Sequence, residues 1–293
     1  MSEKIAFVGI GIMGRPLVQR LLSAGYPVFI FARRPEVAKP LIEQGAILCD
    51  TPADAANEAN LCFSMVSDTP DVEQVILGKH GFSGGAARSD VIVDMSTISP
   101  EVTREIASVL SKRGIEMLDA PVSGGEQGAI EGKLSIMVGG KEAIFERVLP
   151  VLQIIGHNIV RIGEHGAGQV AKACNQLLVA QTIMATAEAI EFAKAAGVDA
   201  GQMRKALLGG FANSKILEVH GQRMLSDDYK PGFKAGLHFK DLRIACESAD
   251  GKDLDLDGLK KAYACLQSLV ERGDADLDSS AMAKIISEQA HKS

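Results

Sequence analysis

The fold is decided near the start of the chain, where residues 5–14 read Ile-Ala-Phe-Val-Gly-Ile-Gly-Ile-Met-Gly. Four apolar residues typical of a strand come first, and a pattern with helical spacing follows directly over residues 15–24. Between a strand and a helix, glycines in the spacing Gly-x-Gly-x-x-Gly allow a tight turn, a close approach to a pyrophosphate, and packing of helix on strand. The stretch therefore predicts a dinucleotide site. Its predicted contacts are Gly9, Gly11, Ile12, Met13 and Gly14.

Outward from this motif, short apolar runs alternate with amphipathic helical segments as far as residue 162. This rhythm is typical of α/β structure with a parallel sheet. Several runs are apolar without alternation, as expected for strands that are covered on both faces. The predicted strands are residues 5–8, 28–31, 46–48, 61–65, 91–94, 117–120, 134–138 and 159–162.

The second half of the chain has a different character. Residues 169–196 contain no glycine or proline and are rich in Ala, Leu, Ile and Met, which predicts one long helix. Further helices are predicted at residues 200–208, 217–225, 240–249, 259–272 and 281–290. The predicted domains are therefore an α/β domain over 1–163 and an all-α domain over 164–293.

Composition narrows the class of protein. At 293 residues, with 46% hydrophobic residues, the chain is long enough for two cores. A formal net charge of -6 disfavours a nucleic-acid partner. The five cysteines are odd in number and widely spaced, and the six histidines show no ligand pattern, so we expect a reduced, cytoplasmic protein without a metal site. We also expect neither a signal peptide nor a membrane partner.

The end of the second predicted strand bears on the choice of cofactor. An NAD site usually places an acidic residue there to bind the adenosine ribose hydroxyls. Here residues 31–35 read Phe-Ala-Arg-Arg-Pro. The guanidinium groups of Arg33 and Arg34 suit the 2′-phosphate of NADP, so we predict that NADP is preferred and NAD is possible. The alternative is that both arginines are solvated loop residues.

Residues 119–125 read Asp-Ala-Pro-Val-Ser-Gly-Gly and follow a predicted strand. The carboxyl edge of an open α/β sheet is where ligands bind. A serine followed by two glycines offers a hydroxyl and successive backbone N–H groups to a carboxylate. We therefore predict substrate contacts at Ser123, Gly124 and Gly125, with an ordinary turn as the alternative.

The long helix carries a polar stripe near its start. Its members are Gln169, Lys172, Asn175 and Gln176, three and four residues apart. Because the rest of this helix is mostly apolar, burying these groups is unfavourable unless something polar faces them. We expect the stripe to face a substrate, and a solvated stripe is the alternative.

Together these residues resemble the β-hydroxyacid dehydrogenase family, and the resemblance covers nearly the whole chain. The motifs that carry it are the glycine fingerprint and residues 94–100, 119–125, 166–175, 230–233 and 238–242. Their joint order and spacing are more specific than any one of them.

The resemblance implies an N-terminal Rossmann domain, an all-α C-terminal domain and a long interdomain helix. It assigns Lys172 as the catalytic acid/base and Asn175, with Ser123–Gly125, as substrate-binding. It further implies that Lys240 approaches the nicotinamide end of the cofactor and that Met65, Val66 and Thr97 line the cofactor. A homodimer or homotetramer is expected.

The predicted function is hydride exchange between a nicotinamide cofactor and a small aldehyde acid or hydroxy acid. A lysine suits this chemistry because an ammonium can protonate and stabilise the developing alkoxide. The resemblance implies tartronate semialdehyde, reduced to glycerate, as the substrate, and the alternatives are 3-hydroxyisobutyrate, glyoxylate and succinic semialdehyde. Two further alternatives are a non-catalytic dinucleotide-binding module and an imine reductase, and the presence of Lys172 disfavours both.

Overall fold

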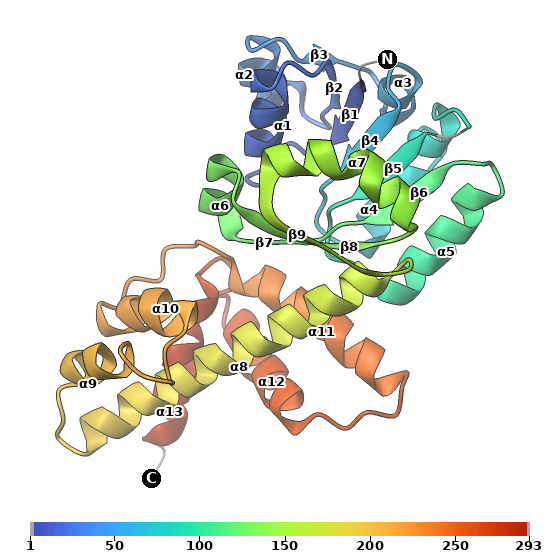
Figure 1. The fold of residues 1–293 in the computed structure, drawn as a ribbon. Helices are drawn as coiled ribbons and strands as arrows, with labels where there is room; N and C mark the ends of the chain where they lie inside the picture. The colour runs from blue at the N-terminus through green and yellow to red at the C-terminus, as the bar shows by residue number, and fades with distance from the viewer. Residues whose placement is uncertain (1–2, 89, 292–293) are drawn as a thin grey trace. The chain divides into compact units, whose positions relative to one another are not determined.

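The computed structural model describes residues 3–88 and 90–291. It divides into two compact units, the first ending at Lys172 and the second beginning at Ala173. Helix α8 (Ala167–Ala195) runs through this boundary (Figure 1). No helix among the described residues combines the length and the apolar character that crossing a bilayer requires.

In the described part of the first unit, nine strands form one sheet in the order β3-β2-β1-β4-β5-β6-β8-β7, with β9 paired to β8. From β3 to β6 every pairing is parallel. The strands are β1 (Ile5–Val8), β2 (Val28–Phe31), β3 (Ile47–Leu48), β4 (Leu61–Ser64), β5 (Val91–Asp94), β6 (Glu116–Asp119), β7 (Val122–Ser123), β8 (Leu134–Gly139) and β9 (Gly156–Gly163).

Helices cover both faces of this sheet, because side chains along a strand point alternately to opposite sides. Ile5 and Phe7 of β1 enter one apolar core with residues of α1, α6 and α7, while Ala6 and Val8 enter the other with residues of α3, α4 and α5. The helices of this unit are α1 (Gly14–Ser23), η1 (Pro35–Ala38), α2 (Lys39–Ile42), α3 (Pro52–Asn57), α4 (Thr69–Leu77), η2 (Phe82–Gly84), α5 (Pro100–Ser111), α6 (Gly125–Glu131) and α7 (Glu142–Ile155).

The sequence-based expectation of parallel pairing is wrong at one end of the sheet. Strand β8 is antiparallel to both β6 and β7, and β7 itself was not expected. The physical reason is connection length: only residues 124–133 separate β7 from β8, and a parallel crossover needs a dozen or more residues.

The second unit is helical, and its helices surround one apolar core that includes Ile183, Leu242 and Leu266. Local capping defines several helix starts: the side chains of Asp199 and Ser214 accept hydrogen bonds from first-turn N–H groups of α9 and α10. The elements after α8 are α9 (Ala200–Leu207), α10 (Lys215–Leu225), α11 (Ala235–Asp250), α12 (Asp257–Glu271), η3 (Ser279–Ala281) and α13 (Met282–Ala290). The predicted fold class, a Rossmann domain followed by a helical domain, is confirmed.

Candidate active site

The glycine loop between β1 and α1 has the shape that a dinucleotide needs. Gly9 has φ +99°, and a Cβ there would overlap the carbonyl oxygen of Met65. A Cβ at Gly14 would overlap the carbonyl oxygen of Gly9, so helix and strand approach closely only without side chains. At Gly11 a Cβ would meet no described atom within 4 Å, which leaves open space where backbone can face a pyrophosphate. The N-cap residue of α1, Met13, makes no side-chain cap, so the loop fits a dinucleotide at a helix N-terminus.

The segments after β4 and β5, which carry Met65, Val66 and Thr97, are joined by polar contacts. The Val66 N–H donates to Ser96 Oγ at 2.9 Å. At the last residues of the two strands, Asp94 Oδ1 accepts hydrogen bonds from Ser64 Oγ at 2.8 Å and from the Ser96 N–H at 3.2 Å. Burial raises the pKa of the Asp94 carboxyl to about 6, although these hydrogen bonds favour its ionised form. The structure thus places the three predicted cofactor-lining residues on two neighbouring, interlocked segments.

Arg33 and Arg34 follow β2 and are exposed to solvent. Arg33 Nη1 lies 3.9 Å from Asp71 Oδ1 at the start of α4, a loose ion pair between an exposed and a half-buried side chain. Its side chain is 84% exposed, so it is accessible to an incoming phosphate.

Ser123, Gly124 and Gly125 form the turn from β7 into α6. Gly124 and Gly125 both have positive φ, 137° and 63°, which glycine adopts without strain. A Cβ at Gly125 would meet no described atom within 4 Å, so backbone is accessible there. The turn presents a half-buried serine hydroxyl beside open backbone.

The first turn of α8 is held by a buried carboxylate at the end of β6. Asp119 Oδ1 accepts from the Gly166 N–H at 2.8 Å, and Oδ2 accepts from the Gln169 N–H at 3.0 Å. Helix N-termini leave such N–H groups unpaired and favour negative charge. Burial raises the pKa of Asp119, and the two backbone hydrogen bonds oppose that shift.

Lys172 lies in the next turn of α8, and its side chain is only 6% exposed. Gln169, which shares this face of the helix, was expected to face a substrate. That expectation is wrong, because its amide is hydrogen-bonded to the backbone of Ser96 and Ile98. Within the polar stripe, Gln169 therefore anchors the start of the helix, and Lys172 lies one turn beyond it.

In the second unit, one polar network contains both Asn175 and Lys240. Asn175 Nδ2 donates to Gln176 Oε1 at 2.7 Å, and Gln176 Nε2 donates to Asp241 Oδ2 at 2.6 Å. Lys240 Nζ lies 2.8 Å from Asp241 Oδ1. This network joins helices α8 and α11. The sequence did not single out Asp241 as a member of the network, because it appeared only within the motif at residues 238–242.

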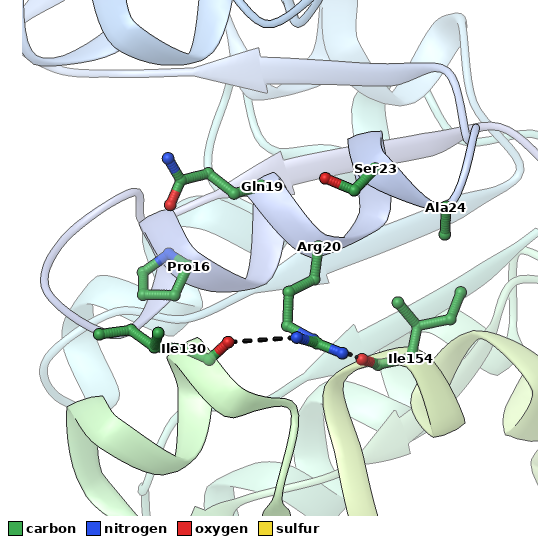
Figure 2. Close-up of a pocket in the computed structure, with 7 residues that line it drawn as sticks. All are labelled: Pro16, Gln19, Arg20, Ser23, Ala24, Ile130 and Ile154. Atoms are coloured by element: carbon green, nitrogen blue, oxygen red, sulfur yellow. Dashed lines mark hydrogen bonds between the residues drawn. The ribbon is translucent and has the colours of Figure 1, made fainter.

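A surface pocket of about 460 Å³ lies beside α1, and the residues that line it do not include those of the glycine loop (Figure 2). Arg20 donates from Nε to the Ile154 carbonyl at 2.7 Å and from Nη1 to the Ile130 carbonyl at 3.1 Å. These carbonyls belong to the last turns of α7 and α6, where cations stabilise helix ends. The role of Arg20 is to hold three helices together.

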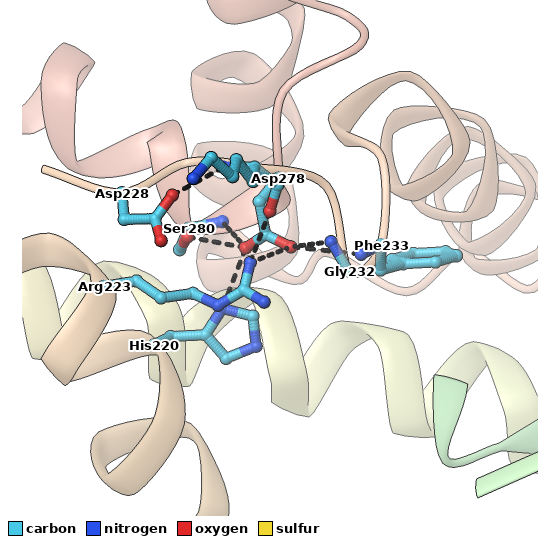
Figure 3. A network of polar contacts seen from close by, with 8 residues as sticks. His220, Arg223, Asp228, Gly232, Phe233, Asp278 and Ser280 are labelled. Carbon is cyan, nitrogen blue, oxygen red and sulfur yellow. Dashed lines mark hydrogen bonds and ion pairs between the residues drawn. The ribbon is translucent and has the colours of Figure 1, made fainter. Parts of the chain in front are cut away.

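Another buried carboxylate, Asp278, organises part of the helical unit (Figure 3). Its Oδ2 accepts from the N–H groups of Gly232 and Phe233 at 2.9 and 3.0 Å and pairs with Arg223 Nη1 at 3.0 Å. Its Oδ1 lies 3.2 Å from His220 Nδ1 and accepts from Ser280. Sequence reasoning missed Asp278, although an aspartate directly before a helical start is a capping signal.

Comparison with known proteins agrees with this architecture. Residues 4–163 match the family described as the NAD binding domain of 6-phosphogluconate dehydrogenase. Residues 166–286 match the family described as NAD-binding of NADP-dependent 3-hydroxyisobutyrate dehydrogenase. The chain is 44% identical over 283 residues to 2-hydroxy-3-oxopropionate reductase of Escherichia coli strain K12, with 97% of each chain covered. The chain belongs to the β-hydroxyacid dehydrogenase family related to 3-hydroxyisobutyrate dehydrogenase.

Two other members of the β-hydroxyacid dehydrogenase family extend the comparison. The 3-hydroxyisobutyrate dehydrogenase of Pseudomonas aeruginosa is 34% identical over 290 residues, which cover 96% of this chain and 97% of that protein. The solved structure of the Mycobacterium tuberculosis 3-hydroxyisobutyrate dehydrogenase, with L-serine, is 30% identical with a TM-score of 0.91 and covers 98% and 99% of the two chains. This dehydrogenase is therefore an NAD(P)-dependent oxidoreductase that acts on CH–OH groups.

Proposed function

We propose that this dehydrogenase reduces a small aldehyde acid, tartronate semialdehyde, to glycerate, with Lys172 as general acid/base. The observation that carries the proposal is the burial of Lys172 on α8, one turn beyond the anchored start of the helix. Lysine is among the residue types least often buried, so a buried lysine near a dinucleotide-binding motif is a candidate functional residue. The 44% identity to a 2-hydroxy-3-oxopropionate reductase supports this substrate class.

The chemistry assigns one role to each group. When bound, the nicotinamide supplies the hydride to the aldehyde carbon. The Lys172 ammonium stabilises the negative charge that develops on the aldehyde oxygen and donates a proton to it, and the neutral amine accepts that proton in the oxidation direction. By resemblance, Ser123, Gly124, Gly125 and Asn175 bind the substrate, and Lys240 lies toward the nicotinamide.

The test is Lys172→Ala. We expect the variant to bind the dinucleotide nearly as well as the wild type and to lose at least about 100-fold in kcat. Lys141→Ala is the matched control, because Lys141 is an exposed lysine of the same unit that pairs with Glu116. Near-wild-type turnover by Lys172→Ala would overturn the proposed role.

The identity of the substrate is tested by comparing several candidate substrates. Similarity to 3-hydroxyisobutyrate dehydrogenases keeps 3-hydroxyisobutyrate as a second candidate. Measuring kcat/KM for tartronate semialdehyde, glyoxylate, succinic semialdehyde and 3-hydroxyisobutyrate, each with both cofactors, identifies the preferred pair. A preference for any of the other three would contradict the proposed substrate and leave the reaction class intact.

We propose that NADPH is the preferred cofactor. The exposed Arg33 and Arg34 provide positive charge beyond β2, and a charge-assisted hydrogen bond contributes about 1.5–3 kcal/mol. Replacing both with alanine should raise KM for NADPH at least about tenfold and change KM for NADH little, so NADH is the internal control. A wild-type preference for NADH would refute this choice.

Self-association is also proposed, as a homodimer or homotetramer. Leu178 and Phe192 of α8 are 64% and 79% exposed, and fourteen residues place them about four turns apart on one face. Such an exposed apolar face is typical of an interface. Light scattering tests it, and a single species of 31.0 kDa at micromolar concentration would contradict it.

The remaining proposals concern location and domain limits. All five cysteines are free thiols in the structure, which supports a reducing compartment such as the cytoplasm. The limits 1–163 and 164–293 remain the proposed domain definition.

A further inference from the structure

We propose that Gln169 is a positioning residue for the reaction: it ties the loops that line the cofactor to the helix turn that presents Lys172. The inference rests on the proposed function, because it takes Lys172 as the acid/base. Gln169 touches neither the reacting atoms nor the cofactor in this scheme, and acts through the placement of its neighbours.

Both polar atoms of the Gln169 side-chain amide have backbone partners. Its side chain is 1% exposed. Nε2 donates to the Ser96 carbonyl at 2.8 Å, and Oε1 accepts from the Ile98 N–H at 3.2 Å. One side-chain amide thus binds the backbone on both sides of Thr97. The position of the loop after β5 is therefore tied to the position of α8.

The same loop is tied to the segment after β4, because Ser96 Oγ accepts from the Val66 N–H. On the other side, the Gln169 backbone N–H donates to Asp119 at the end of β6. One connected path of hydrogen bonds, buried except for the partly buried bond to Val66, therefore joins the ends of β4, β5 and β6 to the first turn of α8. All of these groups lie in the first unit.

The geometry gives this path a mechanistic consequence. Lys172 is three residues after Gln169, so both lie on one face of α8 and any shift of the first turn carries Lys172 with it. A misplacement of about 1 Å can cost roughly 100-fold in rate. A leucine would fill the space of Gln169 but leave the Ser96 carbonyl and the Ile98 N–H without their partner, which favours movement of the loop away from the helix.

The first experiment compares Gln169→Leu with Thr186→Val. Thr186 is also a buried polar residue of α8, and its hydroxyl donates to the Thr182 carbonyl, so its variant removes a partly buried side-chain hydrogen bond from the same helix. We expect Gln169→Leu to lower kcat at least about tenfold and to raise KM for the dinucleotide a few-fold. Thr186→Val should change stability alone. Unchanged kcat in a folded Gln169→Leu enzyme would overturn the inference.

The second experiment repeats Gln169→Leu in the Lys172→Ala background under single-turnover conditions. If Gln169 acts through Lys172, the residual rate should change by less than about twofold, because the two losses are not additive. An equal loss in both backgrounds would show that Gln169 acts independently and would overturn the inference. Failure of the proposed function is distinct, because it appears in Lys172→Ala alone as retained activity.

A third variant covers the case in which Gln169→Leu does not fold. A glutamic acid in this buried position keeps the acceptor toward Ile98, and in its protonated form it also restores a donor toward Ser96. The kcat of Gln169→Glu should therefore approach that of the wild type at low pH and decrease as the pH rises. The wild type should not show this decrease. The same loss of kcat at every pH would overturn the proposed role.

Discussion

Asp94 and Asp278 are both buried carboxylates, one in each unit, yet their surroundings have opposite effects. Asp94 Oδ1 accepts two hydrogen bonds, while Oδ2 has no partner among the described residues. Asp278 uses both oxygens and faces Arg223 and His220. Burial raises the pKa of Asp94 to about 6. Burial also acts to raise the pKa of Asp278, but hydrogen bonds from His220, Ser280 and Phe233 outweigh it and hold that pKa well below its usual range.

The difference shows that burial alone does not decide whether a carboxylate is charged. Desolvation penalises the charge in both places, and the number of donors and cations decides which effect is larger. Asp278 thus holds the loop before α11 as a carboxylate ion. Near neutral pH the Asp94 carboxylate is also ionised, but its hydrogen bonds do not fully offset the desolvation of its charge. Each carboxylate can be tested by removing its charge.

The largest effect is expected for Asp278→Asn. The amide would turn a donor toward the N–H groups or Arg223 and leave buried donors and a cation without a partner, so we expect a loss of roughly 3 kcal/mol in the free energy of unfolding. Because the folded pKa is lowered, this contribution is present above the ordinary carboxyl pKa of about 4 and is lost as the pH falls below it. Urea unfolding at pH 7 measures the loss.

Asp276→Asn is the matched control for Asp278→Asn. Asp276 pairs with Lys234 at 2.7 Å, two residues away from Asp278, but its side chain is 88% exposed. Exposed pairs contribute about 0–1 kcal/mol. Equal losses from the two variants would show that the buried network adds nothing.

A smaller effect, with a defined pH dependence, is expected for Asp94→Asn. Because the folded pKa of Asp94 is raised, its contribution to stability is fully present below pH about 4 and is lost as the pH rises through about 6. Asp119 is a nearby negative charge that acts in the same direction. Relative to the wild type, the asparagine variant should gain roughly 1–2 kcal/mol on going from pH 5 to pH 8. Parallel pH profiles of the two proteins would mean that Asp94 does not titrate in this range.

The smallest effect is expected for Asp71, whose carboxylate is only half-buried. Its loose pair with Arg33 is solvated, so Asp71→Asn should change stability by less than about 0.5 kcal/mol. Without the Asp71 charge, Asp71 no longer competes with the 2′-phosphate for Arg33. KM for NADPH should therefore fall about twofold, while KM for NADH stays constant. A fall in both values would place Asp71 near the shared part of the dinucleotide.

Much of the fold followed from local pattern. The glycine motif, the apolar runs and the glycine-free stretch at 169–196 each predict their element from neighbours in the chain. The reversal at β8 and the short β7 were missed, because pairing direction depends on how far the chain must return and two residues make a weak strand signal.

The fold class and the family could be inferred from the amino-acid sequence alone, because both rest on residue types at fixed spacings. The sequence also named the residues now proposed for catalysis and binding. The contacts that hold these residues are visible only in the folded chain: Asp119 binds the start of a helix 47 residues later, and Gln169 binds a loop more than 70 residues earlier. Hydrogen bonds of such separation have no local signature, since each partner is an ordinary polar residue or backbone group until folding brings it beside the other and removes water from both.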